Sequence, residues 1–226
     1  MRLNNNQLKL LALVFMLCDH VGKVLLPQYQ FLQILGRLAM PVFAYMIAEG
    51  CQHTRVRQRY FLQLFLLATV CQLVYFFTTG SLYQSILITF SLSLLLIFII
   101  DRFRQKKDLF SGVLLIAMTA TVLVVCVGLP RWLSHTDFQI DYGFFGVLLP
   151  VAVYYAPTKP MKLIAAGLAL TGICLDYGNL QWYSLLALPL LALYNGQRGK
   201  WKLKYLFYIF YPTHLVLIQL ISLFLR

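Results

Sequence analysis

The chain has 226 residues, of which 61% are hydrophobic and only 12% are charged. Its apolar runs are too many and too long for a water-soluble domain, so we predict an all-α, polytopic transmembrane protein. The net charge of +12 would suggest a nucleic-acid partner in a soluble protein. In a membrane protein basic residues report topology first, so we expect a lipid bilayer and no nucleic acid.

The first two apolar runs, at about residues 8–26 and 31–50, flank a turn signal at Pro27–Gln30. Each run is about long enough to cross a bilayer once, so the pair is predicted to form a transmembrane helical hairpin. Asp19 and His20 interrupt the first run, which is not typical of a cleavable signal peptide, so we expect the run to remain in the protein.

Three ionisable residues, Asp19, His20 and Arg37, lie in this hairpin. His20 and Arg37 are each about 12–13 Å from the tip at a rise of about 1.5 Å per residue. Ionisable groups at that depth indicate a functional site. Asp19 and His20 point about 100° apart on a helix, so we expect Asp19 to pair with Arg37 and His20 to face a cavity. The alternative is a structural ion pair beside a hydrogen-bonded core histidine.

Seven further apolar runs follow the hairpin, at about residues 60–78, 85–100, 109–129, 142–156, 161–175, 182–194 and 205–224. The chain is therefore predicted to form about nine spans in a single integral membrane domain, residues 1–226. Most of its basic residues lie near the N-terminus and in every second loop. The positive-inside rule then predicts a cytoplasmic N-terminus and a C-terminus on the outer side.

The end of the second run and the loop after it bring together Glu49, His53, Arg55 and Arg57 at the cytoplasmic mouth. Arginine side chains suit the binding of phosphate groups. The alternative is an ordinary cytoplasmic anchor, which would not explain the acidic Glu49, because acids contribute little to that rule.

The motif "YPTH" at Tyr211–His214 places a proline inside the last apolar run. Proline removes a backbone hydrogen bond and bends a helix, which could open a pocket at His214 near mid-membrane. Alternatively, the histidine bonds to a neighbouring helix, because proline is tolerated in membrane helices.

The tripeptide "DYG" occurs at Asp141–Gly143 and at Asp176–Gly178, both predicted on the outer side. Asp141 begins an inward-running helix, so its carboxylate could cap that helix or contact a substrate together with Tyr142. Both copies are alternatively simple turns at helix ends.

The five cysteines are scattered through apolar runs, and no pair has the spacing of a metal or redox site. We therefore expect no bound metal.

Four segments together, "LKLLALVFMLCDHVG", "GRLAMPVFAYMIAEGCQHTR", "DYGFFGVLLP" and "FYIFYPTHL", resemble the TraX family in the same order. That family is similar to polytopic membrane acyltransferases that use acetyl-CoA, and it is linked to pilin acetylation and fimbrial assembly. The resemblance implies a multi-pass acetyltransferase of the bacterial inner (cytoplasmic) membrane. Its co-substrate would be cytoplasmic acetyl-CoA, and its acceptor a pilin N-terminus or another envelope polymer.

On this hypothesis Glu49, His53, Arg55 and Arg57 would bind acetyl-CoA, with Arg198 or Lys200 as further phosphate contacts. The catalytic residues would be Asp19, His20, Arg37 and His214, and the acceptor would meet Asp141, Tyr142 and Tyr211. His20 or His214 would act as the general base, and Arg37 would stabilise the oxyanion. Direct transfer and an acetyl-histidine intermediate both remain open.

Two other functions fit part of the pattern. A small-molecule or ion transporter would also carry charged pairs at mid-membrane, although such proteins favour inverted repeats. A non-catalytic pilus assembly factor would bind pilin helices in the membrane and would not need His20.

Overall fold

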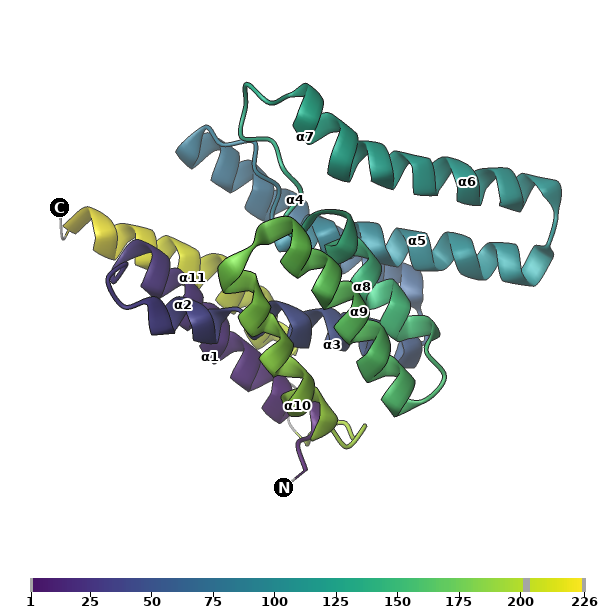
Figure 1. The fold of residues 1–226 in the computed structure, drawn as a ribbon, viewed down its shortest axis with the longest axis horizontal. Coiled ribbons are helices and arrows are strands. Elements are labelled where there is room, and N and C mark those ends of the chain that lie inside the picture. The colour runs from purple at the N-terminus through teal and green to yellow at the C-terminus, as the bar shows by residue number, and fades with distance from the viewer. Residues whose placement is uncertain (1, 201–203, 225–226) are drawn as a thin grey trace. The chain divides into compact units, whose positions relative to one another are not determined.

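A computed structural model of the chain describes residues 2–200 and 204–224, which are mostly helical (Figure 1). The predicted all-α class is confirmed. The chain divides into two compact units. Unit 1 comprises Met1–Met46 and Ala166–Arg226, and unit 2 comprises Ile47–Ala165.

Unit 1 is built around the N-terminal helix α1, which packs against α2 and α11. The short η2 segment, a 3₁₀ helix, packs against α2 and α10. The elements of unit 1 are α1 (Asn5–Val24), α2 (Gln30–Gly36), the first part of α3 (Ala39–His53), the last part of α9 (Lys159–Tyr177), η2 (Asn179–Leu186), α10 (Ala187–Ala192) and α11 (Lys204–Phe224).

Helix α1 begins with a capping box. The Asn4 side chain accepts from the Gln7 backbone N–H at 3.0 Å, and the Gln7 side chain accepts from the Asn4 N–H at 2.9 Å. These bonds satisfy two backbone donors that a helix start otherwise leaves unpaired. They therefore fix where α1 begins.

A glycine lets α1 and α2 approach each other closely. A Cβ atom added at Gly36 would lie 2.6 Å from the Cα of Asp19. No real side chain fits at that separation, so the absence of a side chain at Gly36 brings the α2 backbone against Asp19. The contact sets the position of the residue that follows, Arg37.

The predicted second span corresponds to α2 and α3, which together form an apolar segment of 24 residues. The structure interrupts this segment with a turn at Arg37 and Leu38. The Arg37 N–H lies within hydrogen-bonding distance of the carbonyls of both Gln33 and Ile34, which is the tightening common at a helix end. The apolar run at residues 31–50 predicted one continuous helix, and the prediction is wrong at this turn.

Unit 2 is organised on α5, which packs against α4, α6 and α8. Figure 1 shows α5 and α6 running side by side. The buried Ser93 hydroxyl on α5 donates to the Val147 carbonyl of α8 at 2.8 Å. The elements of unit 2 are the last part of α3, α4 (Arg57–Thr79), α5 (Ile86–Lys106), α6 (Leu109–Leu123), the π-helical η1 (Val124–Gly128), α7 (Leu129–Trp132), α8 (Gly143–Tyr155) and the first part of α9.

The π-helical η1 segment has a cause in the sequence. Pro130 has no N–H, and its ring cannot fit against the carbonyl four residues earlier. The chain widens before it, and the Leu129 N–H donates to the Val124 carbonyl, five residues back. A bulge of this kind is the usual response to such a local conflict.

Two details of the predicted helices are wrong, the end of one helix and the regularity of another. Helix α5 does not end near residue 100 but continues to Lys106, and Lys107 ends it in the left-handed region at φ 52°. The run at residues 182–194 is not a regular helix, because it divides between η2 and the six-residue α10. Pro189 lies inside α10 and has no N–H that could donate to the carbonyl four residues earlier.

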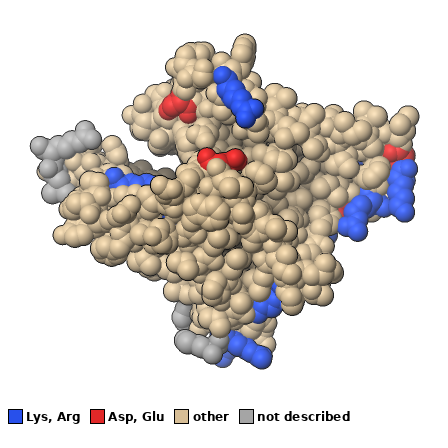
Figure 2. Space-filling view, viewed as in Figure 1, with Lys and Arg blue, Asp and Glu red and all other residues tan. Residues whose placement is uncertain are grey.

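Within the described residues, five helical segments are long and apolar enough to cross a membrane, and they are Gln30–His53, Arg57–Thr79, Ile86–Lys106, Leu109–Trp132 and Lys159–Tyr177. Two shorter apolar helices are Gly143–Tyr155 and Tyr208–Phe224. On the face drawn in Figure 2, most of the surface carries neither acidic nor basic side chains. The chain is therefore a membrane protein, while nine spans and a cytoplasmic N-terminus stay predictions.

Candidate functional site

The predicted ion pair between Asp19 and Arg37 is present in unit 1. The Arg37 Nη2 group donates to one carboxylate oxygen of Asp19, and both side chains are largely buried. A second cation, Lys23, which no sequence pattern had indicated, has its Nζ atom 2.6 Å from the other oxygen. A single buried carboxylate therefore balances two cations.

Arg37 donates a hydrogen bond from each of its three side-chain nitrogens. Besides Asp19, its Nε group donates to the Gln33 carbonyl and its Nη1 group to the Gln181 side-chain oxygen, each at 3.4 Å. Because an arginine can only donate, this bond fixes the amide orientation of Gln181. The Gln181 Nε2 atom then remains buried without a hydrogen-bond partner. Sequence reasoning missed Gln181, because a neutral amide inside an aromatic segment gives no pattern signal.

The two predicted catalytic histidines lie together in unit 1. The rings of His20 on α1 and His214 on α11 have centroids 5.1 Å apart. His214 also stacks on Phe210 at 5.0 Å and meets Tyr211 edge-on at 5.8 Å. The Tyr211 ring predicted to meet the acceptor therefore borders this histidine pair.

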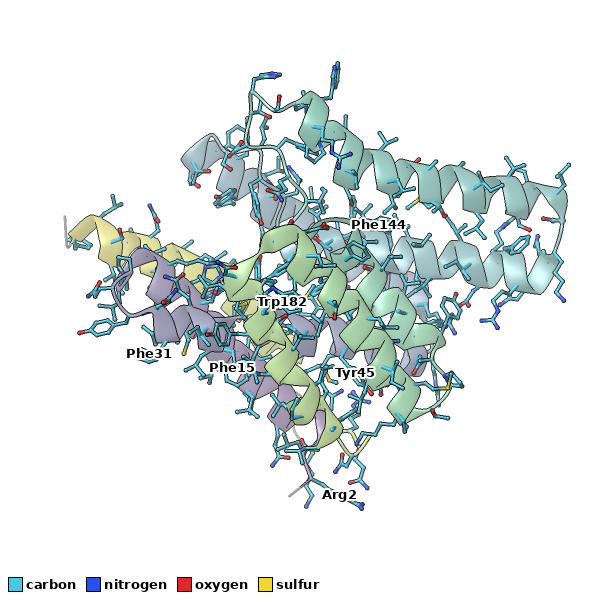
Figure 3. All side chains as sticks on the ribbon, in the orientation of Figure 1. Arg2, Phe15, Phe31, Tyr45, Phe144 and Trp182 are labelled. Carbon is cyan, nitrogen blue, oxygen red and sulfur yellow. The ribbon has the colours of Figure 1, made fainter. Side chains whose placement is uncertain are left out.

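An apolar cluster supports the histidine pair from the side of α1. Phe15, labelled in Figure 3, packs together with Phe210 and Tyr211 against a buried group. That group consists of Leu13, Met16 and Ala39. The surroundings are therefore low in dielectric, which strengthens any electrostatic interaction made there.

The tautomer of His214 follows from its hydrogen bond. Its Nδ1 atom lies 2.7 Å from the Phe210 carbonyl oxygen, which can only accept. Nδ1 therefore carries the proton, and in the neutral ring Nε2 holds a free lone pair. The Nε2 atom is buried without a partner, and the residue is only 4% exposed. Folded proteins rarely leave a buried acceptor of this kind unpaired, so Nε2 is a candidate contact for a bound group.

Two chains of contacts thus begin at the adjacent residues Asp19 and His20 of α1. One runs from Asp19 through Arg37 to Gln181, and the other runs from His20 to His214. Each ends on a buried polar atom without a partner. The arrangement offers a proton acceptor on a histidine, a donor on an amide, and charged groups that hold α1 and α2 in place.

The four residues of the predicted phosphate-binding group all lie in unit 2. Glu49 pairs with Lys162 at 2.5 Å rather than with an arginine. The side chain of His53 is 71% exposed, and its ring N–H donates to the Glu49 carbonyl. Arg55 is exposed. Helix α3 ends at His53, which leaves Arg55 in the connection before α4.

Arg57 does lie in a polar cluster, with partners that the sequence did not reveal. It donates to Asp101 at 2.6 Å, and the hydroxyls of Tyr154 and Tyr155 lie 3.0 and 2.8 Å from the same carboxylate. These residues line an open pocket of about 410 Å³. The remaining lining residues are Gln52, Arg104, Ala156, Pro157 and Lys162.

The other predicted acceptor contacts, Asp141 and Tyr142, belong to unit 2. The Asp141 carboxylate accepts from the Tyr83 hydroxyl at 2.5 Å, and its carbonyl accepts from Thr89 at 2.7 Å. Tyr142 and Gly143 both have positive φ angles, 59° and 55°. "DYG" therefore forms a tight left-handed turn before α8, pinned to the start of α5.

The loop before that turn is tied down by an exposed aspartate. The Ser81 hydroxyl and the Leu82 N–H both donate to Asp137, at 2.5 and 2.9 Å. The bond from Ser81, followed by that from Leu82, lowers the pKa of this carboxyl below its ordinary value.

Across the part of the chain that the structure describes, no three His, Cys, Asp or Glu side chains form a group that could hold a metal ion. The predicted phosphate contacts Arg198 and Lys200 are exposed in unit 1. Lys202, in the same basic loop, lies outside the described residues.

Comparison with known proteins adds the family. Residues 4–222 match the family described as TraX protein. The chain is also 25% identical to the probable fimbrial assembly protein FimC, serogroup H1, of Dichelobacter nodosus, over 97% of this chain and 96% of that protein. No solved structure matches. The family match covers nearly the whole chain and agrees with the predicted resemblance, so this protein belongs to the TraX family.

Proposed function

We propose that this protein is a membrane acetyltransferase that moves an acetyl group from acetyl-CoA to an amine or hydroxyl of an envelope acceptor, with a pilin N-terminus as the preferred class. The observation that carries the proposal is the buried Nε2 atom of His214, which holds a free lone pair beside His20. Membership of the TraX family and the fimbrial relative support the choice of acceptor.

The chemistry requires a base, and His214 supplies one. The acceptor amine attacks the thioester carbonyl carbon and gives a proton to His214 Nε2. This attack forms the carbon–nitrogen bond of a tetrahedral intermediate. The intermediate expels the thiolate by breaking the carbon–sulfur bond, and the imidazolium returns the proton to the sulfur. The hydrogen bond from Nδ1 to the Phe210 carbonyl holds the ring in the required tautomer. His20 stabilises the charged ring only while it is itself neutral.

The second chain of contacts supplies the oxyanion partner. Gln181 Nε2 is a buried donor without an acceptor, and a donor of this kind suits the negative oxygen of a tetrahedral intermediate. Arg37 orients that amide through its bond to the Gln181 oxygen. We therefore assign Arg37 a positioning role, and direct contact of Arg37 with the oxyanion remains a prediction from the sequence.

The four histidines of the chain provide a matched test, because the half-buried His20 and the buried His214 form the ring pair, and the other two, His53 and His135, are exposed. Each would be replaced by Ala in protein reconstituted in lipid nanodiscs. The assay measures free thiol released from acetyl-CoA in the presence of a peptide with a pilin-like N-terminus, and mass spectrometry of that peptide confirms transfer.

We expect His214→Ala to lose at least about a hundredfold in kcat, the usual contribution of a general base, and His20→Ala to lose activity as well. His53→Ala and His135→Ala should match wild type. If all four variants turn over like wild type, or if wild type transfers no acetyl group, the proposal is wrong.

The relative's name favours a second function, that of a non-catalytic assembly factor. In that case His20→Ala and His214→Ala would leave pilus assembly unchanged. A bulky change on a strongly exposed apolar position, such as Ile116→Trp on α6, would impair it. Counting surface pili in cells that carry each variant separates the two functions.

A further inference from the structure

We infer that the pocket in unit 2 binds a nucleoside phosphate, and that Arg104 is the residue that holds the phosphate. The inference rests on the proposed function, because it assigns to this pocket the phosphorylated adenosine end of the donor. It replaces the predicted phosphate contacts at His53 and Arg55, which do not line the pocket.

The pocket has a size and lining suited to such a ligand. Its volume of about 410 Å³ lies within the range of about 300–1,000 Å³ typical of small-molecule sites. Its walls combine the Gln52 amide, the phenols of Tyr154 and Tyr155, and three cationic side chains. The two tyrosine rings meet edge-on, with centroids 4.9 Å apart. These walls provide aromatic faces beside positive charge.

Two of the three cationic side chains that line the pocket form ion pairs with acidic residues. Arg57 is neutralised by Asp101, and Lys162 is neutralised by Glu49. Arg104 also lines the pocket, and no acidic side chain among the described residues pairs with it. The positive charge available to a ligand therefore lies at Arg104.

A stacking contact holds Arg104 ready to bind. Its guanidinium carbon lies 5.1 Å from the centre of the Tyr155 ring. The Tyr155 hydroxyl in turn lies 2.8 Å from Asp101, which anchors the ring. Stacking leaves the edge of a guanidinium free to donate, and this planar fork matches two phosphate oxygens.

Asp101 does not cancel the attraction for an anion. Its carboxylate already accepts from Arg57, and it lies within hydrogen-bonding distance of both tyrosine hydroxyls. These contacts occupy three of the roughly four acceptor sites of the carboxylate, and the positive charge of Arg57 offsets its negative charge. A phosphate on Arg104 would also attract Arg57, whose side chain is 39% exposed.

Helix α5 offers a matched control. Arg102 lies two residues from Arg104 and also stacks on an aromatic ring, with its guanidinium carbon 5.5 Å from the centre of Phe110, but it does not line the pocket. Arg102→Gln and Arg104→Gln therefore remove the same charge and the same kind of stacking from one helix. A third variant, Arg104→Lys, keeps the charge and removes the fork.

The experiment measures binding of adenosine 3′,5′-bisphosphate by isothermal titration to protein in nanodiscs. We expect wild type and Arg102→Gln to bind alike, and Arg104→Gln to bind about tenfold or more weakly, since charge-assisted hydrogen bonds are lost. Arg104→Lys should fall between them. Acetyl-pantetheine, which lacks the nucleotide, should bind wild type and Arg104→Gln equally. Thermal unfolding of each variant shows that the comparison is made on folded protein.

Wild-type affinity in folded Arg104→Gln, an equal loss in Arg102→Gln, or no binding in wild type would each overturn the site. Failure of the proposed function looks different. Binding that depends on Arg104 in a protein that transfers no acetyl group would support the pocket and refute the transferase.

Discussion

Replacing Asp19 by Asn should lower the free energy of unfolding substantially, because it leaves Arg37 without a carboxylate in a buried position. The Arg37 and Asp19 side chains are only 14% and 12% exposed. Removing one partner of a buried ion pair typically costs about 3–5 kcal/mol. Lys23 should contribute less than about 1 kcal/mol, since its side chain is 46% exposed and can turn to water. Lys23→Gln is therefore the matched control on the same carboxylate.

The measurement is a double-mutant cycle with Asp19→Asn, Arg37→Gln and the double variant. Unfolding in detergent would be followed by tryptophan fluorescence, for which the chain has three tryptophans. We expect the double variant to be less destabilised than the sum of the single variants, with a coupling energy of about 0.5–3 kcal/mol. Single effects that add to within about 0.5 kcal/mol would refute the reasoning. A stable Arg37→Gln variant without activity would instead show that Arg37 serves the reaction rather than the fold.

Three further predictions follow from the fold. Gly36→Ala should destabilise the protein by about 1–3 kcal/mol because the added Cβ overlaps α1. Gly112→Ala is the control and should not destabilise it, because the nearest side-chain atom there is 3.5 Å away. Equal unfolding midpoints for the two variants would contradict the close contact at Gly36. Reporter fusions at Thr54 and Ser134 should give opposite signals, and matching signals would disprove the predicted topology. Because the pKa of Asp137 is lowered by its donors, notably Ser81, its contribution to loop stability should be present at neutral pH and lost as pH falls below about 4. Hydrogen exchange of the loop should therefore respond to Asp137→Asn at pH 7, and the response should shrink as the pH falls below about 4.

The sequence predicted those features that follow from local pattern or from the cost of burying charge. The helix expected at residues 142–156 is α8, Gly143–Tyr155, because an apolar run inside a bilayer satisfies its own backbone hydrogen bonds only as a helix. Asp19 and Arg37 were expected to pair because opposite charges at one depth in a membrane cannot remain apart. The pairing was foreseen without knowledge of Gln181 or Lys23.

The features that the sequence did not predict depend on which distant segments pack together. Glu49 pairs with Lys162, 113 positions away along the chain, and no pattern selects that lysine among the other cations. Asp101 lies just beyond the apolar run that was expected to end near residue 100, yet the helix continues and Asp101 pairs with Arg57. The turn at Arg37 was likewise hidden, because an apolar run does not reveal a break made by a close contact with another helix.

The carboxylates of this protein are almost all committed to structural partners. Asp19, Glu49 and Asp101 hold buried or half-buried cations, and Asp137 and Asp141 fasten loops. A genetic screen that neutralises acids one by one would therefore recover many loss-of-function variants whose protein is simply degraded. Such a screen would point away from the reaction centre, whereas imidazole substitutions scored at equal protein abundance would separate chemistry from folding.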